Sequence, residues 1–298
     1  MKKKLSLPER LLPGYRQHDA ERIDHETSTL AILPYIYSSR QAASVFTRQS
    51  CNITETLRYI ENYNNAGGDH KLSLFGVLIA ALLCTGIHHP ALNRYILGKR
   101  VYQGKKLRAS FTVKQDMSRA GKEMVAKVTG RPEDALQDIT GRVDRVIRKI
   151  RMQDNAGKGD LIEGVLRLPS FVLRIVFRLE KFLHNWGVLP RRLMDSDPLY
   201  SSIFIANLGS LGLGPVYHPL YERGTVSVFV VLSKQRTENG IGADGSIVSH
   251  NMLDLSFTVD SRITDGYSLA EGLRYLKALL EDPRLLERQF ANQDRPVV

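Results

Sequence analysis

The segment Leu255-Ser-Phe-Thr-Val-Asp-Ser-Arg-Ile-Thr-Asp-Gly266, continuing to Leu-Leu-Glu-Asp-Pro283, is the most informative part of this chain. Its apolar, β-branched and aromatic residues predict a buried strand over 252–259. A tight turn follows, and leucines at three- and four-residue steps predict an amphipathic helix over 268–280. The polar residues between the strand and the helix are therefore the first candidates for chemistry.

The rest of the chain predicts alternating strands and helices in one main domain. The pattern includes a uniformly apolar helix stopped by His88-His89-Pro90 and a nearly continuous β-branched run typical of a central strand. The strands are expected at 44–52, in two pieces within 101–113, at 201–206, 225–233 and 252–259, and the helices at 54–64, 72–87, 135–151 and from 169 onward. A glycine-rich turn is expected at 207–214, and Ala-Asp-Gly-Ser246 is typical of a hairpin turn.

Composition and charge limit the cellular compartment and the classes of ligand that we expect for this chain. The chain has 298 residues and a formal net charge of +11, which suits contact with anionic lipid or phosphorylated ligands. The basic helix over 135–151 lacks aromatic interleaving or any nucleic-acid motif, so no nucleic-acid partner is expected. The two cysteines, Cys51 and Cys84, have no metal-like spacing, so we expect no metal. Such cysteine usage and the lack of a signal peptide favour the cytoplasm.

A second helix candidate begins at Pro169 and combines a broad apolar surface with a thin basic stripe of Arg174, Arg178 and Lys181. Charges at mid-bilayer are costly, so it is not expected to span a membrane. Three settings suit it: a subunit interface, the wall of an acyl-chain tunnel, or the surface of an anionic membrane. The last would make the protein peripheral to the membrane, and added salt would weaken its binding to anionic vesicles.

Several pieces resemble one family in the same order along the chain. Thr258-Val-Asp-Ser-Arg-Ile-Thr-Asp-Gly266 is similar to the C-terminal motif of the dihydrolipoyl acyltransferase catalytic domain of 2-oxo acid dehydrogenase complexes. Phe204-Ile-Ala-Asn-Leu-Gly-Ser-Leu-Gly212 resembles its strand and turn, and Leu74 to Asn93 its long buried helix. Val45-Phe-Thr resembles its entering strand. The resemblance covers about residues 40–155 and 195–285.

This resemblance implies an α/β fold like that of chloramphenicol acetyltransferase, a mixed sheet with flanking helices that assembles as a homotrimer. It implies active sites between subunits, with coenzyme A or a carrier thioester as acyl donor. We expect an N-terminal arm with little structure over 1–42, the catalytic-type domain over 43–285 with an apolar and basic insertion at about 157–195, and a tail over 286–298. The lipoyl and subunit-binding segments of the large complexes have no counterpart here, which favours a free-standing protein.

The chain departs from the family at two chemical positions. The family motif carries a histidine base, and Ser261 stands in its place, between Asp260 and Arg262 and before Asp265 and Gly266. Imidazole suits proton removal near neutral pH, whereas an alcohol with no base does not. The family also places a serine or threonine hydroxyl before the Asn-Leu-Gly turn, where it steadies an oxyanion, and here Ala206 precedes Asn207.

The remaining motif residues are expected to maintain geometry. In the family, the aspartate aligned with Asp265 acts through an arginine pair, for which Arg262 is the candidate here, and Gly266 is expected to meet a backbone requirement before the helix. Asp260 could polarise the Ser261 hydroxyl, although an exposed carboxylate is a weak base for an alcohol.

Two functions therefore stay open. In one, the protein is an acyltransferase with a non-standard site, and His218 in Tyr217-His-Pro-Leu-Tyr-Glu222 is the best substitute base. In the other, it is an inactive homologue that binds thioesters or serves as a scaffolding or regulatory subunit for a partner enzyme. The acyl group and the acceptor do not follow from either.

Overall fold

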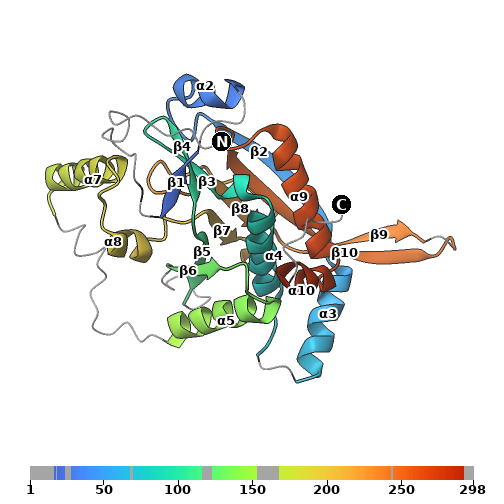
Figure 1. Cartoon of the computed structure of the whole chain (residues 1–298). Coiled ribbons are helices and arrows are strands. Elements are labelled where there is room, and N and C mark those ends of the chain that lie inside the picture. Colours follow the sequence, from blue (N-terminus) through green and yellow to red (C-terminus); the bar gives the residue numbers. More distant parts are fainter. Residues whose placement is uncertain are drawn as a thin grey trace.

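A seven-stranded mixed sheet forms the centre of the protein (Figure 1). The computed structural model describes residues 17, 19–23, 28–67, 70–115, 123–152, 168–242 and 244–291. The strand order is β2-β10-β8-β7-β5-β6, with β9 pairing β10, and β7 runs parallel to β5 and β8. These strands are β2 (Ser44–Asn52), β5 (Leu107–Lys114), β6 (Glu123–Gly130), β7 (Ile203–Asn207), β8 (Val228–Leu232), β9 (Arg236–Ile241) and β10 (Ile247–Asp260). The predicted mixed sheet is confirmed.

Helices cover one face of this sheet, as Figure 1 shows for α4, α5, α9 and α10. The helix α4 is buried along nearly its whole length, which explains why its sequence is apolar on all sides. Ser73 caps its first turn by accepting a hydrogen bond from the Gly76 N–H at 3.1 Å. The helices of this layer are α3 (Thr54–Asn65), α4 (Leu74–His88), α5 (Leu136–Met152), α9 (Gly266–Glu281) and α10 (Arg284–Ala291).

The opposite face of the sheet carries a second, aromatic cluster. Along β7, Ile203 and Ile205 enter the main core, whereas Phe204 packs with Phe229 on the other side, as strand alternation requires. Their rings stack at 5.1 Å between centroids. Leu220, from the loop between β7 and β8, completes this cluster and ties that loop to the sheet.

The two strand-like pieces predicted within 101–113 belong to different sheets. β4 (Arg100–Gly104) pairs with β3 (Arg94–Leu97) and with β1 (Ala20–Arg22) in a three-stranded sheet, whereas β5 joins the large one. Each of these strands pairs with strands that are distant in the sequence, and the local sequence pattern does not specify which sheet a strand joins.

The segment before β2 has more structure than expected. It contains β1 and a helix, α2 (Ser28–Ile36), within the predicted arm over 1–42. At the other end, α10 extends past residue 285, where the tail was expected to begin. The domain boundaries themselves stay predictions.

The predicted insertion contributes two helices, α7 (Ser170–Asn185) and α8 (Arg191–Ser196), and its residues 157–167 lie outside the described residues. Pro169 is the N-cap of α7, as the sequence predicts. Figure 1 places α7 at one side of the molecule, apart from the helical layer on the sheet. In the part of the chain that the structure describes, no helix combines the length and apolarity needed to cross a bilayer.

Candidate functional site

A buried ion cluster fixes the turn that carries Ser261. Asp260, at the end of β10, is fully buried and accepts hydrogen bonds from Arg262 Nε and Nη2, both at 2.8 Å. Arg40 Nε lies 3.9 Å from the same carboxylate. Burial lowers the pKa of Arg40, and the Asp260 carboxylate opposes that shift. One carboxylate therefore holds two buried guanidinium groups, Arg262 beside it in the turn and Arg40 from the segment before β2.

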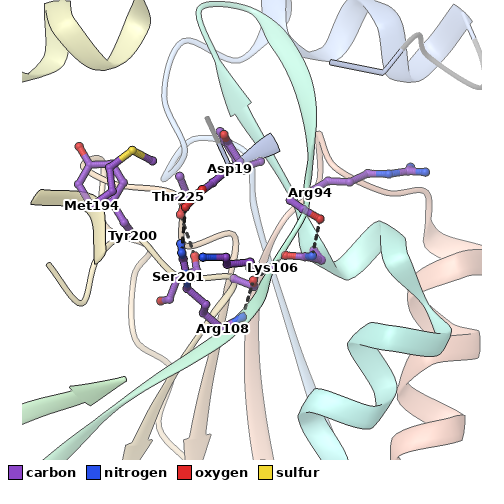
Figure 2. Close-up of a pocket in the computed structure, with 12 residues that line it drawn as sticks. Asp19, Arg94, Lys106, Arg108, Met194, Tyr200, Ser201 and Thr225 are labelled. Carbon is purple, nitrogen blue, oxygen red and sulfur yellow. Dashed lines mark hydrogen bonds and ion pairs between the residues drawn. The ribbon is translucent and has the colours of Figure 1, made fainter. Parts of the chain in front are cut away.

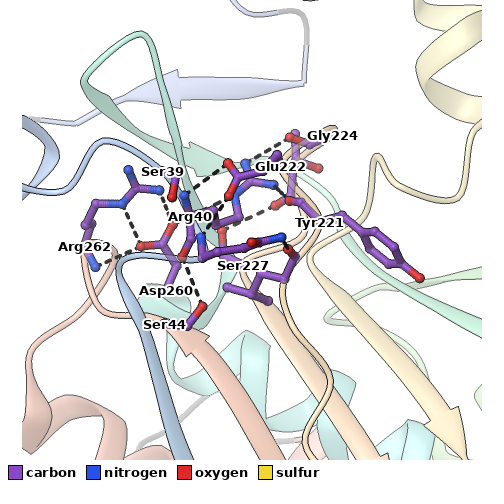
Figure 3. Close-up of polar contacts among 12 residues, drawn as sticks. Ser39, Arg40, Ser44, Tyr221, Glu222, Gly224, Ser227, Asp260 and Arg262 are labelled. Atoms are coloured by element: carbon purple, nitrogen blue, oxygen red, sulfur yellow. Dashed lines mark hydrogen bonds and ion pairs between the residues drawn. The ribbon is translucent and has the colours of Figure 1, made fainter.

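Arg40 also holds the loop between β7 and β8 (Figure 3). Its guanidinium donates to the carbonyls of Tyr221 at 2.8 Å and Gly224 at 3.0 Å. The Glu222 carboxylate, in the same loop, accepts hydrogen bonds from the backbone N–H groups of Arg40 and Gln41. The cluster thus joins three segments that lie far apart in the sequence.

These contacts correct the expected role of Asp260. Its carboxylate is not exposed, and its oxygens face Arg262 and Arg40 rather than the Ser261 hydroxyl. Ser261 itself is half-buried, and its N–H donates to the Ala43 carbonyl at 2.9 Å. Among the described residues, no imidazole or carboxylate hydrogen-bonds its side chain. Within the part of the chain that the structure describes, Ser261 therefore has no base hydrogen-bonded to its hydroxyl.

Asp265 and Gly266 have roles other than those expected. Asp265 is the N-cap of α9, where its carboxylate accepts from the Ser268 N–H and hydroxyl at 2.9 Å each, and no arginine of the described residues pairs with it. The backbone hydrogen bond from Ser268 lowers the pKa of Asp265. Gly266 is exposed, its φ is not positive, and a Cβ there would meet no atom within 4 Å. Its backbone therefore does not require glycine, and the space beside it is open.

The glycine-rich turn has a true backbone requirement at Gly209. A Cβ there would lie 2.1 Å from the Ser233 carbonyl oxygen, so only glycine allows the turn to approach the end of β8. Asn207 accepts from the Ser210 N–H at 3.2 Å and closes the turn. Ala206 precedes it, packs beside the aromatic cluster and supplies no hydroxyl.

The strand register shows that Ala206 and Ser261, the two positions that were expected to differ from the family, lie far apart within one chain. Ala206 pairs with Val231, which in turn pairs with Ser256 of β10. Ser261 lies five residues further along the chain, which corresponds to roughly 16 Å at ~3.3 Å per strand residue. Within one chain, Ser261 and Ala206 therefore lie toward opposite ends of the sheet and cannot act on the same atom.

His218 lies on the aromatic face of the sheet. Its ring stacks on Phe229, with centroids 4.1 Å apart and an interplanar angle of 11°. Nδ1 lies 2.7 Å from the Pro219 carbonyl oxygen, which can only accept, so Nδ1 carries the proton. In the neutral ring, Nε2 then keeps its lone pair. This arrangement suits a base, although the structure does not bring it into contact with Ser261.

The basic stripe of α7 divides into two parts. All three side chains are exposed, and only Lys181 lines a cavity of about 450 Å³, which Arg262 also lines. Arg174 and Arg178 lie outside that lining. Contact of these residues with an acyl chain or an anionic membrane stays a prediction. The cavity itself was missed by sequence reasoning, because its walls come from segments distant in the chain.

A second polar cluster, also missed, surrounds Arg108 (Figure 2). Arg108 Nη2 donates to Asp19 at 2.8 Å and to Asp195 at 2.7 Å, and so connects β5 to the segments around β1 and α8. The space among these side chains is about 20 Å³, close to the volume that one water needs. We assign this cluster a structural role, since no acyl thioester fits there.

Comparison with known proteins supports the resemblance drawn from the motifs. Residues 190–287 match the family model for 2-oxoacid dehydrogenases acyltransferase (catalytic domain). The acetyltransferase component of the pyruvate dehydrogenase complex of Bacillus subtilis is 28% identical over 154 residues, which cover 50% of this chain and 34% of that protein. The lipoamide acyltransferase component of the branched-chain complex of Pseudomonas putida is 35% identical over 86 residues, or 29% and 20% of the two chains. The chain spans about a third or less of the curated relatives it matches.

Solved structures confirm the fold. A probable dihydrolipoamide acetyltransferase of Listeria monocytogenes superposes with a TM-score of 0.57 at 14% identity, covering 93% of this chain and 98% of that one. A chloramphenicol acetyltransferase gives 0.54 at 12% identity, with 88% and 99% covered. The fold is therefore that of chloramphenicol acetyltransferase, as the sequence predicts. The family match begins after α7, so that helix lies outside it.

Replacing Asp260 tests the ion cluster. Asp260→Asn leaves two buried guanidinium groups without their counter-charge, so we expect the free energy of unfolding to fall by about 3–5 kcal/mol. Urea denaturation measures the loss. Asp282 is a matched control, because it accepts from Arg284 Nε at 2.8 Å in the same local geometry at an exposed site. Asp282→Asn should cost less than about 1 kcal/mol, and equal losses would contradict the cluster's role.

Replacing Asp265 tests whether its side chain acts as the N-cap of α9 or takes part in catalysis. Asp265→Ala should lower the unfolding free energy by about 1 kcal/mol, whereas Asp265→Asn, also a good N-cap, should lower it much less. Because the folded pKa of Asp265 is lowered, any excess stability of wild type over Asp265→Asn exists above the unfolded-chain pKa of about 4. It disappears as pH falls through the folded value. Thermal unfolding at pH 7 and pH 3 checks both points, and a catalytic role would instead show as lost turnover in a fully stable Asp265→Asn variant.

Proposed function

We propose that this protein binds an acyl thioester, of coenzyme A or of a carrier, and transfers the acyl group to a small or lipidic acceptor. The observation that carries the proposal is the position of the family match, which includes the turn from Asp260 to Gly266. In that turn the buried Asp260–Arg262 pair is intact, although the family histidine is absent. Acyl transfer is the chemistry for which this scaffold is known among the relatives named above.

The space around Ser261 is compatible with a thioester. Ser261 is half-buried, and the neighbouring Gly266 faces open space, so a pantetheine arm has room to approach this turn. The thioester is a substrate here: an acceptor hydroxyl or thiol attacks its carbonyl, the carbon–sulfur bond breaks, and the donor leaves as a free thiol after taking up a proton. A base must remove the acceptor's proton, which Ser261 cannot do.

His218 is our candidate for that base. Its Nδ1–H donates to the Pro219 carbonyl, which leaves the Nε2 lone pair available to accept a proton. The stack on Phe229 fixes the ring plane. A general base typically contributes about 10²- to 10⁴-fold in rate, so an active site that relies on a substitute should depend strongly on this side chain.

A complete site requires more than one copy of the chain. Register places Ser261 and Ala206 toward opposite ends of one sheet, so the two family positions meet only if they come from different protomers. Exposed apolar side chains support association: Ile241 and Ile247 face each other across the β9–β10 hairpin and are 85% and 78% exposed. Figure 1 shows this hairpin projecting from the body of the molecule. We infer a homo-oligomer, a trimer in accordance with the resemblance.

The second candidate is a non-catalytic homologue that binds thioesters or supports a partner enzyme. Two specific observations favour it: no base among the described residues contacts the Ser261 hydroxyl, and Ala206 offers no hydroxyl to an oxyanion. Loss of an oxyanion donor alone typically costs about 10²- to 10³-fold in rate. The intact ion cluster fits this candidate equally well, because it maintains the turn whatever stands at position 261.

Turnover assays distinguish the two candidates. Release of free thiol is measured with short-, medium- and long-chain acyl-coenzyme A and a panel of alcohol, amine and thiol acceptors. If the first holds, His218→Phe, which keeps an aromatic ring on Phe229 but lacks the base, lowers turnover about 10²- to 10⁴-fold. Activity that appears only in the double variant Ser261→His with Ala206→Thr supports the second. A protein that neither binds nor turns over any thioester contradicts the first candidate and the thioester-binding form of the second.

Sedimentation velocity tests the assembly. Wild type should sediment as an oligomer, and Ile241→Asp with Ile247→Asp should shift it toward the monomer, because the substitutions place charge on the apolar tip. Leu179→Asp is the matched control, since Leu179 is another exposed apolar residue, 53% exposed, on α7. A monomeric wild type would contradict the inference, and dissociation by Leu179→Asp alone would place the interface on α7 instead.

A further inference from the structure

A cavity of about 450 Å³ lies between α7, the β3–β4 turn and the loop held by Arg40. Phe177, Lys181 and His184 reach it from one face of α7, at the four- and three-residue steps that align side chains on a helix. The opposite wall comes from Ile96 to Lys99 and from Arg262. The cavity is large enough for a small organic molecule.

Basic residues dominate the charged lining. The lining contains five cationic side chains and two carboxylates. The cationic residues are Arg40, Lys99, Lys181, Arg223 and Arg262, and the carboxylates belong to Glu180 and Glu222. Both carboxylates already accept hydrogen bonds, Glu180 from Arg223 and Tyr200, and Glu222 from two backbone N–H groups. Lys181 has no ion pair among the described residues. Arg40 and Arg262 share the Asp260 carboxylate, and Arg223 pairs with Glu180 and Asp197, so the unbalanced positive charge in this lining is carried by its lysines.

A buried polar atom in the lining also lacks a partner. His184 is only 5% exposed, and its Nε2 makes no hydrogen bond within the described structure. Burial, together with the nearby positive charges of Arg40 and Arg223, lowers the pKa of His184 to about 4, so the ring is neutral at pH 7. Its ring packs edge-on against Tyr200, with centroids 4.9 Å apart. A buried polar atom without a partner is costly, so His184 is a sensitive reporter of any change in the packing around this cavity.

We propose that this cavity binds an organic ligand through a compact oxyanion, a carboxylate or a phosphate. Lys181 supplies the unpaired positive charge that attracts the oxyanion, and His184 lines the same cavity one turn further along α7. Ile96, Leu97 and Phe177 contact the apolar part of the ligand. The site does not rest on acyl transfer, and α7, which forms one wall, lies outside the range that matches the acyltransferase family.

Titration calorimetry with inorganic phosphate and with succinate tests the site. We expect saturable binding of at least one, and Lys181→Gln should weaken it about two- to fivefold, as for loss of one partly exposed charge pair. Arg178→Gln is the matched control, because it removes the same charge from the same helix outside the cavity. Preference for phosphate or for succinate identifies the oxyanion. Absence of binding, or equal weakening by both variants, overturns the proposal.

Magnetic resonance of ¹⁵N-histidine-labelled protein provides an independent readout. Occupation of the cavity should shift the Nε2 resonance of His184, identified by its loss in His184→Gln, while that of surface-exposed imidazoles stays unchanged. No shift at saturating phosphate or succinate overturns binding of the oxyanion in this cavity. Both measurements concern binding alone, so a protein without acyltransferase activity can still pass them.

Discussion

The Asp260 carboxylate is the interaction on which the candidate site depends. It is fully buried and lies between two guanidinium groups that would otherwise repel each other inside the protein. Through Arg262 it fixes the turn after β10, and through Arg40 it holds the loop from Tyr221 to Gly224. Since none of these contacts involves the side chain at position 261, the shape of the turn is independent of the residue that stands there. The ion cluster can therefore hold the same turn for different side chains at this position.

The sequence predicted those elements best whose local hydrophobic pattern reflects their burial in the folded protein. The strand, turn and helix around Ser261 and the uniformly apolar α4 were predicted because burial dictates their periodicity. It failed for Arg40, which lies in a segment with no periodicity and acts through a partner far along the chain. It also misassigned Asp265, because an N-cap and an arginine partner are both expected of an aspartate before a helix.

The cavity and its unpartnered histidine could not be predicted for a similar reason. His184 appears in the sequence as one polar residue among many apolar ones on α7, and only the tertiary fold shows that it is buried. Lys181 and Arg262 become neighbours across the same cavity, although one belongs to a helix outside the family match and the other to the family motif. The cavity thereby joins a residue inside the family match to a helix outside it.

The position of β2 beside β10 has a consequence for biosynthesis. Ser50 and Asp254, which contact each other across these strands, are 204 residues apart. At about 5–20 residues per second, a ribosome needs roughly 10–40 s to make the intervening chain. During that interval β2 lacks β10, the strand beside which it lies in the large sheet, and unpaired strand edges aggregate readily. Nascent chains of this protein should therefore depend on chaperones until the last strand emerges.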